Sequence, residues 1–273
     1  MFFDRVLSYA IRPRIYIILR GGLGNQLHQI AAAVKYSEIS SHAVKIYPHI
    51  VDNDLNPSRR GFFREIDLSR VFNKSTISEV NKWELFSIRI ILRYIPAITR
   101  HIEVNEEKFD SKIVFPVKVM CGWFQSFDYL PENLNVNALV EKANLNTKAL
   151  TIHVRLTDFL LIDNHPLDAA YYTSAYKIMV KENLPEKVHC YSDDIRSASQ
   201  LLKELPNLYF PEKDELLPPN LLLAQLASSI NLICSKSSLC WWAALIVSRN
   251  GGRVISPWVD STHNSEWLRI AHQ

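Results

Sequence analysis

The chain lacks a long hydrophobic run, a paired cysteine motif and the basic, cleavable start of a secretory signal. A transmembrane helix needs about 20 consecutive apolar residues, and no stretch provides them, so we expect no membrane span. The 4 cysteines (Cys121, Cys190, Cys234 and Cys240) have neither Cys-x-x-Cys spacing nor histidines at metal-binding spacing. This excludes the common zinc motifs, and we predict no metal site. Scattered thiols without a secretion signal predict a cytoplasmic protein.

The chain also has little net charge. A formal net charge of +3 over 273 residues is too small to indicate a nucleic-acid-binding protein, so we expect no nucleic-acid partner. A hydrophobic content of 48% with 22% charged residues is typical of a packed globular chain. The length accommodates one large domain or two modest ones.

Glycine is scarce, with 7 residues, yet three of them stand together in the stretch Gly21-Gly22-Leu23-Gly24. The apolar run before it, residues 15–19, predicts a buried parallel strand. The pattern after it, residues 25–40, predicts a helix with an apolar face. A strand that turns into a helix through glycines leaves free backbone N–H groups, which can receive phosphate or sugar oxygens. A tight turn without a ligand remains the alternative.

Two nucleotide-binding motifs are excluded at this turn. No lysine follows the glycines, so the phosphate-binding loop of nucleotide triphosphatases is absent. Gly22 and Gly24 match two positions of the dinucleotide fingerprint, but Leu27 occupies the third. The acidic residue that would bind ribose is missing after the next predicted strand, residues 44–47. We therefore do not expect a nicotinamide-dependent dehydrogenase.

Strand and helix signals alternate along the chain, which predicts an α/β fold with parallel sheets. The predicted strands are 15–19, 44–47, 117–121, 149–154, 188–191, 208–210, 231–234 and 253–256; the predicted helices are 25–40, 171–180, 195–205, 221–228 and 237–246. Residues 131–147 are polar and rich in asparagine, and we interpret them as an interdomain connection. This predicts one domain at 1–146 and a second at 147–273, with the active site in the cleft between them.

Polar residues follow three predicted strands of the second half, where ligands of α/β sheets bind. The first group is His153-Val154-Arg155-Leu156-Thr157-Asp158. Side chains alternate along a strand, so His153 and Arg155 share one face while Val154 points into the core. Arg155 suits recognition of a diphosphate; a structural ion pair with Asp158 is the alternative.

The second group is Tyr191-Ser192-Asp193-Asp194. We prefer a role for Asp193 in hydrogen bonding to a base or ribose. A magnesium ion held by the adjacent carboxylates is one alternative. A plain helix start capped by Ser192 or Asp193 is another.

The third group is Ser235-Lys236-Ser237-Ser238, followed by Leu239-Cys240-Trp241-Trp242. The hydroxyls of Ser237 and Ser238 at a helix start, together with its free N–H groups, make an anion site. Of Trp241 and Trp242, we expect one to face the core and the other to line a cleft or a contact.

Together these segments resemble the α-1,2-fucosyltransferases and, more widely, the fucosyltransferases of the GT-B fold. The motifs that carry the resemblance run in order over most of the chain: residues 21–31 (GGLGNQLHQIA), 122–126 (GWFQS), 153–158 (HVRLTD), 191–194 (YSDD) and 237–244 (SSLCWWAA). The chain has His28 where the family has phenylalanine and Ile30 where it has tyrosine. The departure that bears on the donor site is Leu156, which replaces the second arginine of His-x-Arg-Arg-x-Asp. By strand alternation, position 156 lies on the opposite face from Arg155, so its loss need not remove the phosphate contact.

The resemblance implies two Rossmann-like domains facing across a cleft. It also implies transfer of L-fucose from GDP-β-L-fucose with inversion, and activity without a metal or other cofactor. In this interpretation Arg155, His153, Ser192, Asp193, Ser237, Ser238 and Trp241 bind the donor. The acceptor enters near Gly22, Gly24, Asn25 and Gln26. Arg155 stabilises the departing diphosphate, and His28 and Asp158 are the candidates for the general base.

We therefore predict a bacterial galactoside α-1,2-fucosyltransferase that acts on a lipid-linked repeat unit of an O-antigen or capsule. Residues 85–102 carry three arginines, one histidine and no acid. This segment suits peripheral contact with the inner face of the plasma membrane, although a half-buried helix with a basic edge is an equal alternative. A homologue with a different donor, or a non-catalytic sugar- or nucleotide-binding protein, is the alternative function that Leu156 suggests.

Overall fold

The computed structural model divides the chain into two compact units, Met1–Ala138 and Leu139–Gln273. The structure describes residues 14–40, 42–47, 62–72, 77–84, 86, 101–102, 117–120, 122–140, 147–156, 167–181, 184–211, 217–257 and 267–269. The boundary precedes the one we expected after residue 146. The asparagine-rich stretch is also not an exposed connection over its described part, because Leu134, Val136, Leu139 and Val140 are buried.

Unit 1 holds a parallel sheet with the strand order β3-β2-β1-β5-β4. Its strands are β1 (Arg14–Ile18), β2 (Ala43–Tyr47), β3 (Ile77–Glu79), β4 (His101–Ile102) and β5 (Val117–Met120). The central strand β1 is buried along its whole length, as its continuous apolar sequence predicts for a strand covered on both faces. Register places Ile17 beside both Ile46 and Met120, so the carboxyl ends of β2, β1 and β5 lie next to one another.

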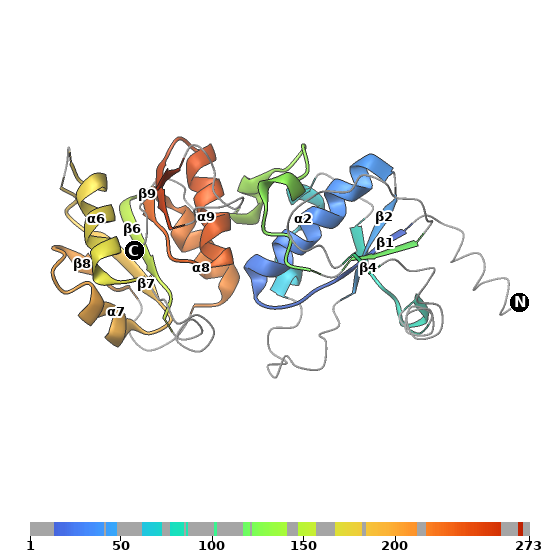
Figure 1. Cartoon of the computed structure of the whole chain (residues 1–273), viewed down its shortest axis with the longest axis horizontal. Coiled ribbons are helices and arrows are strands. Elements are labelled where there is room, and N and C mark those ends of the chain that lie inside the picture. Colours follow the sequence, from blue (N-terminus) through green and yellow to red (C-terminus); the bar gives the residue numbers. More distant parts are fainter. Residues whose placement is uncertain are drawn as a thin grey trace, which may run out of the picture. The chain divides into compact units, whose positions relative to one another are not determined.

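Helix α2 (Leu23–Ser40) follows β1 directly and packs on this sheet (Figure 1). Its alanines and branched residues, among them Ala31, Ala32, Ala33 and Val34, are fully buried. The small alanine side chains allow this helix to pack closely on the sheet.

A buried ion pair fixes the opposite, amino edge of this sheet. Arg14, the first residue of β1, donates to the Glu84 carboxylate over 2.6 Å, and the Lys45 ammonium lies 3.4 Å from the same oxygen. The Glu84 side chain is only 2% exposed. Removing one partner of such a buried pair leaves a charge without compensation, so this contact ties the short helical turn at residues 82–84 to the sheet.

Unit 2 holds a second sheet with parallel pairings throughout, ordered β11-β10-β9-β6-β7-β8. The strands are β6 (Lys148–Val154), β7 (Val188–Ser192), β8 (Leu208–Tyr209), β9 (Ser229–Ile233), β10 (Arg253–Ser256) and β11 (Leu268–Arg269). The helices are α6 (Ala169–Met179), α7 (Ile195–Leu201), α8 (Pro219–Ala227) and α9 (Ser238–Arg249). This α/β alternation is the one that the sequence predicts.

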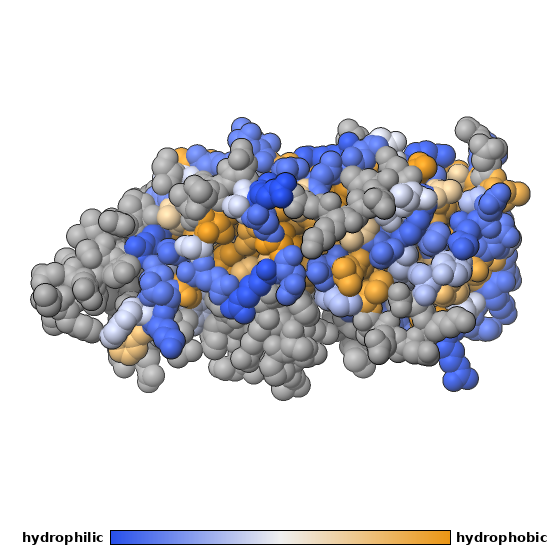
Figure 2. All heavy atoms as spheres, turned by 180° about the vertical axis from the view of Figure 1, so that it is seen from behind, coloured by the Kyte–Doolittle hydropathy of each residue, from blue (hydrophilic) through white to orange (hydrophobic). Residues whose placement is uncertain are grey.

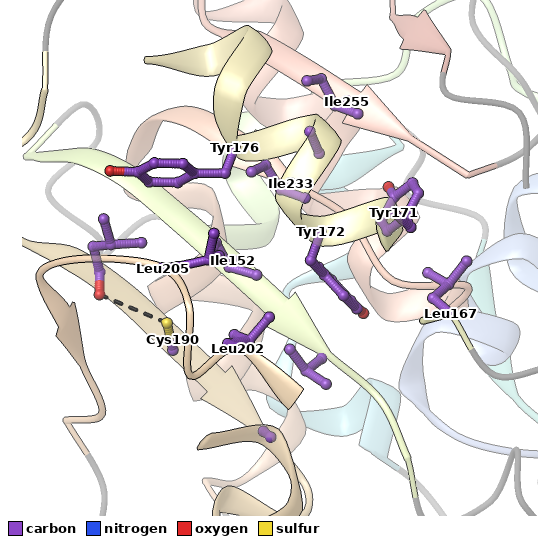
Figure 3. Packing of buried hydrophobic residues seen from close by; sticks show 14 of the residues in the cluster. Ile152, Leu167, Tyr171, Tyr172, Tyr176, Cys190, Leu202, Leu205, Ile233 and Ile255 are labelled. Carbon is purple, nitrogen blue, oxygen red and sulfur yellow. Dashed lines mark hydrogen bonds between the residues drawn. The ribbon is translucent and has the colours of Figure 1, made fainter. Parts of the chain in front are cut away.

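The two faces of this sheet carry different helices. Leu150, Ile152 and Val154 of β6 pack in one hydrophobic cluster with residues of α6 and α7. Figure 3 shows this packing, with Tyr171, Tyr172 and Tyr176 of α6 near Ile152 and Ile233. Tyr191, an intervening residue of β7, faces the other side and hydrogen-bonds to Gln225 of α8, and Lys148 at the start of β6 reaches the same glutamine. Since α8 and α9 pack together, we assign both to this second face.

Most large hydrophobic side chains are buried, but a few are exposed. On the face drawn in Figure 2, hydrophobic patches lie among hydrophilic residues. The most exposed large hydrophobic residues of the described chain are Leu184 at 70%, Trp83 at 68%, Phe86 at 54%, Leu221 at 49%, Ile39 at 48% and Trp123 at 47%. Single exposed hydrophobic side chains are common in folded proteins, and exposure alone does not indicate a binding surface.

Candidate functional site

The carboxyl ends of β6, β7 and β9 lie side by side in the sheet of unit 2. Ile152 of β6 pairs with both Cys190 of β7 and Ile233 of β9. The residues that follow these strands therefore come together at one edge, which is where parallel α/β sheets bind ligands. The three groups that the sequence singles out all lie at this edge.

Arg155 is held there by Asp193. One carboxylate oxygen of Asp193 lies 3.2 Å from Nε of Arg155, and the other accepts a hydrogen bond of 2.9 Å from the backbone N–H of Leu156. The Arg155 side chain keeps 27% of its surface exposed, whereas that of Asp193 keeps 7%. Its described contacts make Asp193 the residue that positions Arg155; binding of a base or ribose of the donor by Asp193 stays a prediction. Asp158, the other partner considered for Arg155, lies outside the described residues.

Leu156 points away from this site. It is 9% exposed and belongs to the hydrophobic cluster under α6 and α7. This placement agrees with the prediction that Leu156 does not share the site of Arg155. The position that carries a second arginine in the family pattern is used here for core packing, while its backbone N–H holds Asp193.

His153 is buried beneath this edge, with 2% of its surface exposed. Its Nδ1 lies 2.8 Å from Oγ of Ser235, a residue that follows β9. The hydroxyl of Tyr172 donates to the His153 carbonyl oxygen over 3.3 Å, and that of Tyr171 donates to the Cys234 carbonyl oxygen over 2.8 Å. Adjacent tyrosines of α6 therefore hold the ends of two neighbouring strands in place.

From the sequence, Ser235 belongs to the third polar group without a predicted role, and the tyrosine pair has no predicted role either. Burial raises the pKa of the Tyr171 and Tyr172 hydroxyls well above the ordinary value, so both remain hydrogen-bond donors. The only sequence signal for them is a pair of tyrosines at the start of a predicted helix. This signal does not indicate which carbonyl groups their hydroxyls bind.

Asp194, not Ser192 or Asp193, caps α7. Its side chain accepts a hydrogen bond of 3.0 Å from the Ser197 backbone N–H, and the hydrogen bonds from Ser197 lower its pKa. The hydroxyl of Ser192 bonds only to the backbone of Asp194 among the contacts described. The two adjacent aspartates thus have separate partners: Asp194 binds the start of α7, and Asp193 binds the segment that contains Arg155.

The start of α9 offers backbone and hydroxyl donors at the same edge. Ser237 occupies the cap position, but its side chain makes no capping hydrogen bond. Ser237 and Ser238 are both partly exposed. The first N–H groups of a helix have no partner within the helix and attract anions. Arg155 follows β6 and α9 follows β9, and these two strands are neighbours in the sheet, so the guanidinium and the start of α9 lie at the same edge.

The expectation that one of the two tryptophans of α9 lines a cleft is wrong. Trp241 and Trp242 are 2% and 0% exposed. Their rings pack edge to face with centroids 5.3 Å apart, and Trp241 also packs on Trp267 at 5.8 Å. Both indoles are part of the core, so any effect of Trp241 on a donor acts through the position of α9.

In unit 1 the glycine turn follows β1 as predicted. Gly21 has a positive φ of 71°, a conformation that glycine adopts without strain. Its carbonyl oxygen accepts a hydrogen bond of 2.9 Å from the Gln26 side chain, whose own oxygen accepts one of 3.3 Å from the Phe63 backbone. Gly24 and Gln26 are buried in α2. They support the turn, and of the four acceptor residues predicted only Gly22 and Asn25 are partly exposed.

Asn25 is fixed by a residue from a distant part of the chain. Its side-chain oxygen accepts a hydrogen bond of 2.8 Å from Gln125, which follows β5. This contact joins two of the sequence motifs at the carboxyl edge of unit 1. At Gly22 a Cβ atom would meet nothing within 4 Å, so the backbone there is open to an approaching group.

His28 does not lie at this open edge. It is 1% exposed within α2, and burial lowers its pKa to about 3. A general base must reach the hydroxyl proton that it removes, and a side chain enclosed in this way does not. The prediction of His28 as a candidate base is therefore wrong.

Within the parts of the chain that the structure describes, no group of three or more His, Cys, Asp and Glu residues could hold a metal ion. Over the same residues, no helix is long and apolar enough to cross a membrane. Of the basic segment 85–102, the structure describes only Phe86 and the last two residues. His101–Ile102 form β4 and pair with Val119 and Met120, so this end of the segment belongs to the sheet.

Comparison with known proteins identifies the class of fold. No protein-family model matches the chain. The structure of POFUT1 in complex with GDP matches with a TM-score of 0.50 at 12% sequence identity, over 88% of this chain and 96% of that one. Fucosyltransferase NodZ from Bradyrhizobium matches with a TM-score of 0.43 at 15% identity, over 86% of this chain and 93% of that one. The fold is the α/β fold with parallel sheets of the GT-B fucosyltransferases.

A curated relative extends this comparison to the sequence. The chain is 22% identical over 314 residues to the O-antigen biosynthesis glycosyltransferase WbnK of Escherichia coli. The match covers 94% of this chain and 100% of the relative. The similarity therefore extends over both units and is not confined to one motif.

Proposed function

We propose that this protein is an inverting glycosyltransferase that moves L-fucose from GDP-β-L-fucose to the 2-hydroxyl of a terminal β-galactoside. The observation that carries the proposal is Arg155, held by Asp193 at the sheet edge where α9 also begins. The full-length similarity to an O-antigen biosynthesis glycosyltransferase and the GDP bound by POFUT1 support it. The 2-hydroxyl as the point of attachment rests on the sequence motifs.

In this proposal the edge of unit 2 binds the donor diphosphate. Arg155 provides a guanidinium that forms charge-assisted hydrogen bonds to phosphate oxygens. Ser237, Ser238 and the N–H groups of α9 contact the same group. Negative charge grows on the diphosphate as the sugar departs, so donors that are already in place stabilise the transition state more than the ground state. Cationic and N–H donors carry this function without a metal ion.

The acceptor binds at the glycine turn of unit 1, near Gly22 and Asn25. Asp158 is the remaining candidate for the base that takes the proton of the attacking hydroxyl.

We further propose that the acceptor is a lipid-linked repeat unit of an O-antigen or capsule, modified on the cytoplasmic side of the membrane. The basic composition of residues 85–102 supports contact with an anionic lipid surface. Sedimentation with anionic vesicles checks this part separately, since a soluble galactoside does not need the membrane. Failure to bind such vesicles contradicts the membrane contact and leaves the transfer reaction intact.

The direct experiment incubates purified protein with radiolabelled GDP-fucose and a β-galactoside, in EDTA and in magnesium. We expect labelled product in both, with an α linkage to the 2-hydroxyl by NMR. Transfer from another GDP- or UDP-sugar, but not from GDP-fucose, contradicts the donor. Product only in magnesium contradicts the metal-free mechanism. Tight binding of GDP with no transfer to any acceptor favours the non-catalytic alternative.

A further inference from the structure

Trp123 is presented to solvent by an unusual backbone. It follows β5 at the carboxyl edge of unit 1, and it is 47% exposed. The next residue, Phe124, has a positive φ of 54° although it is not glycine. Its ring is 3% exposed and packs edge to face on Tyr129 at 5.3 Å. The chain therefore reverses locally to bury Phe124, and the preceding indole is left outside.

Gly122 makes this arrangement possible. A Cβ atom at Gly122 would lie 3.1 Å from the Phe124 ring, which is closer than ordinary contact. A buried aromatic residue in the left-handed region costs free energy, and such strain persists where the surrounding structure enforces it, often at functional sites. The exposed indole is thus held in a fixed position.

The glycine turn lies directly against this indole. A Cβ atom placed on Gly21 would be 3.3 Å from Cζ3 of Trp123. Gln125, two residues further along, donates to Asn25 of the same turn over 2.8 Å. An aromatic face, two amide groups and the open backbone at Gly22 therefore share one edge of the sheet.

Arg20 adds a cation to this edge. Register pairs Ile17 with Met120, so Arg20 and Trp123 each come three residues after that pair, beyond the ends of neighbouring strands. Arg20 is partly buried, and its Nε is enclosed without a hydrogen-bond partner in the described structure. Because the residue as a whole is only partly buried, the accessible part of its guanidinium can donate to a ligand oxygen.

We propose that Trp123 is the stacking platform for the acceptor sugar and that Arg20 donates hydrogen bonds to the same sugar. This inference rests on the proposed function, because it assigns the acceptor to this edge. A β-galactopyranoside has consecutive C–H bonds on one face of its ring. This apolar face complements an indole, while hydroxyls at its rim need donors and acceptors such as Arg20, Asn25 and Gln125.

The test measures sugar binding without turnover. Saturation-transfer NMR records contact between the protein and methyl β-galactoside, methyl β-glucoside or methyl β-N-acetylgalactosaminide, with no donor present. We expect a signal from the wild-type protein with the galactoside and a loss of it in Trp123→Ala. Trp123→Phe, which keeps a ring, should retain part of the signal. Trp83→Ala is the matched control, because Trp83 is exposed near the amino edge of the same sheet.

Kinetics then separate acceptor from donor. Trp123→Ala and Arg20→Gln should each raise the KM of the galactoside about tenfold, with the KM of GDP-fucose unchanged. Equal melting temperatures establish that the variants fold. A Trp123→Ala protein that binds the glycosides as the wild type does overturns the inference, and so does a wild type that binds none of them. If Arg20→Gln instead raises the KM of GDP-fucose, the guanidinium of Arg20 binds the donor. That result overturns the proposal that Arg20 donates to the acceptor sugar.

The NMR result does not depend on the donor. Galactoside contact that is lost in Trp123→Ala supports the platform even if fucose transfer is never observed. Fucose transfer that persists in Trp123→Ala with an unchanged acceptor KM contradicts the platform and leaves the proposed function in place.

Discussion

At the scale of single residues, Asp193 and Arg155 show how one carboxylate fixes the direction of a guanidinium. Asp193 uses one oxygen for the side chain of Arg155 and the other for the backbone one residue later. The two contacts together restrain the end of β6 as well as the arginine. Preorganised charge of this kind lowers the cost of stabilising a leaving group.

Replacement of Arg155 tests this site. Arg155→Ala should lower kcat/KM for GDP-fucose about 100- to 1,000-fold, or about 3–4 kcal/mol, because a donor to the transition state is lost. Asp193→Asn, which keeps an acceptor for Leu156 but removes the charge, should have a smaller effect. Arg253→Ala, at the exposed amino end of β10, is the control. Wild-type turnover by Arg155→Ala would rule out its role.

The buried His28 predicts an acid-sensitive contribution to stability. Burial lowers its pKa from 6.5 to about 3. As the pH falls below 6.5, the unfolded chain takes up a proton that the folded protein does not. Protonation lowers the free energy of the unfolded state, so the free energy of unfolding falls. The full difference amounts to at most about 5 kcal/mol.

His28→Phe and His28→Gln should therefore lose less unfolding free energy than the wild type between about pH 6.5 and pH 4. Urea unfolding at several pH values measures this. The phenylalanine variant matches the residue of the family pattern, and the glutamine variant keeps a polar group without titration. Parallel pH profiles for all three proteins would show that His28 is not buried neutral.

At the scale of elements, the glycine turn offers two adjacent positions with opposite requirements. Gly21 has a positive φ, and a Cβ atom there would lie 2.7 Å from the Asn25 side chain. Gly21→Ala should therefore cost about 1–2 kcal/mol of unfolding free energy, and it should disturb Asn25. Gly22→Ala should leave stability nearly unchanged, because the added atom meets nothing within 4 Å.

If a substrate approaches the backbone at Gly22, the same small substitution should still raise the acceptor KM. Comparing melting temperature with kinetics for the two variants separates folding from binding. An unaffected KM in Gly22→Ala, with unchanged stability, would remove the turn from the acceptor site.

Most of the elements follow from the sequence, and the reason is burial. Residues 15–19 are a continuous apolar run, and residues 149–154 and 253–256 each contain buried apolar residues; each forms a central or neighbouring strand within a residue of the predicted bounds. The strands β3, β4 and β11 are not predicted. They are three residues long or shorter, and the partner strand that creates them lies far away in the sequence.

The candidate site is only partly predictable for the same reason. Ligands of parallel α/β sheets bind at the carboxyl ends of the strands. This depends on topology alone, so it places Arg155, Asp193 and the start of α9 at one edge. It does not reveal that Asp193 binds Arg155, that both indoles of α9 are buried, or that His28 is enclosed in its helix. Each of these depends on side-chain packing between segments that are distant in the sequence.

At the scale of the whole molecule, the two units should respond to different ligands. GDP should slow hydrogen exchange at the ends of β6 and β7 and at the start of α9, because a ligand that binds only the folded state suppresses local opening. The glycine turn should respond to the acceptor. Arg155→Ala should abolish the GDP response. Protection of residues 20–25 by GDP alone would contradict this division.

The packing of Leu156 has a consequence for how such chains are recognised. Its side chain fills the core, and only its main-chain amide contacts Asp193 at the carboxyl edge of the sheet. A search pattern that demands two consecutive arginines would discard chains built like this one, although the second guanidinium is not what orients the first. A better criterion is a strand-end arginine together with an aspartate at the end of the adjacent strand.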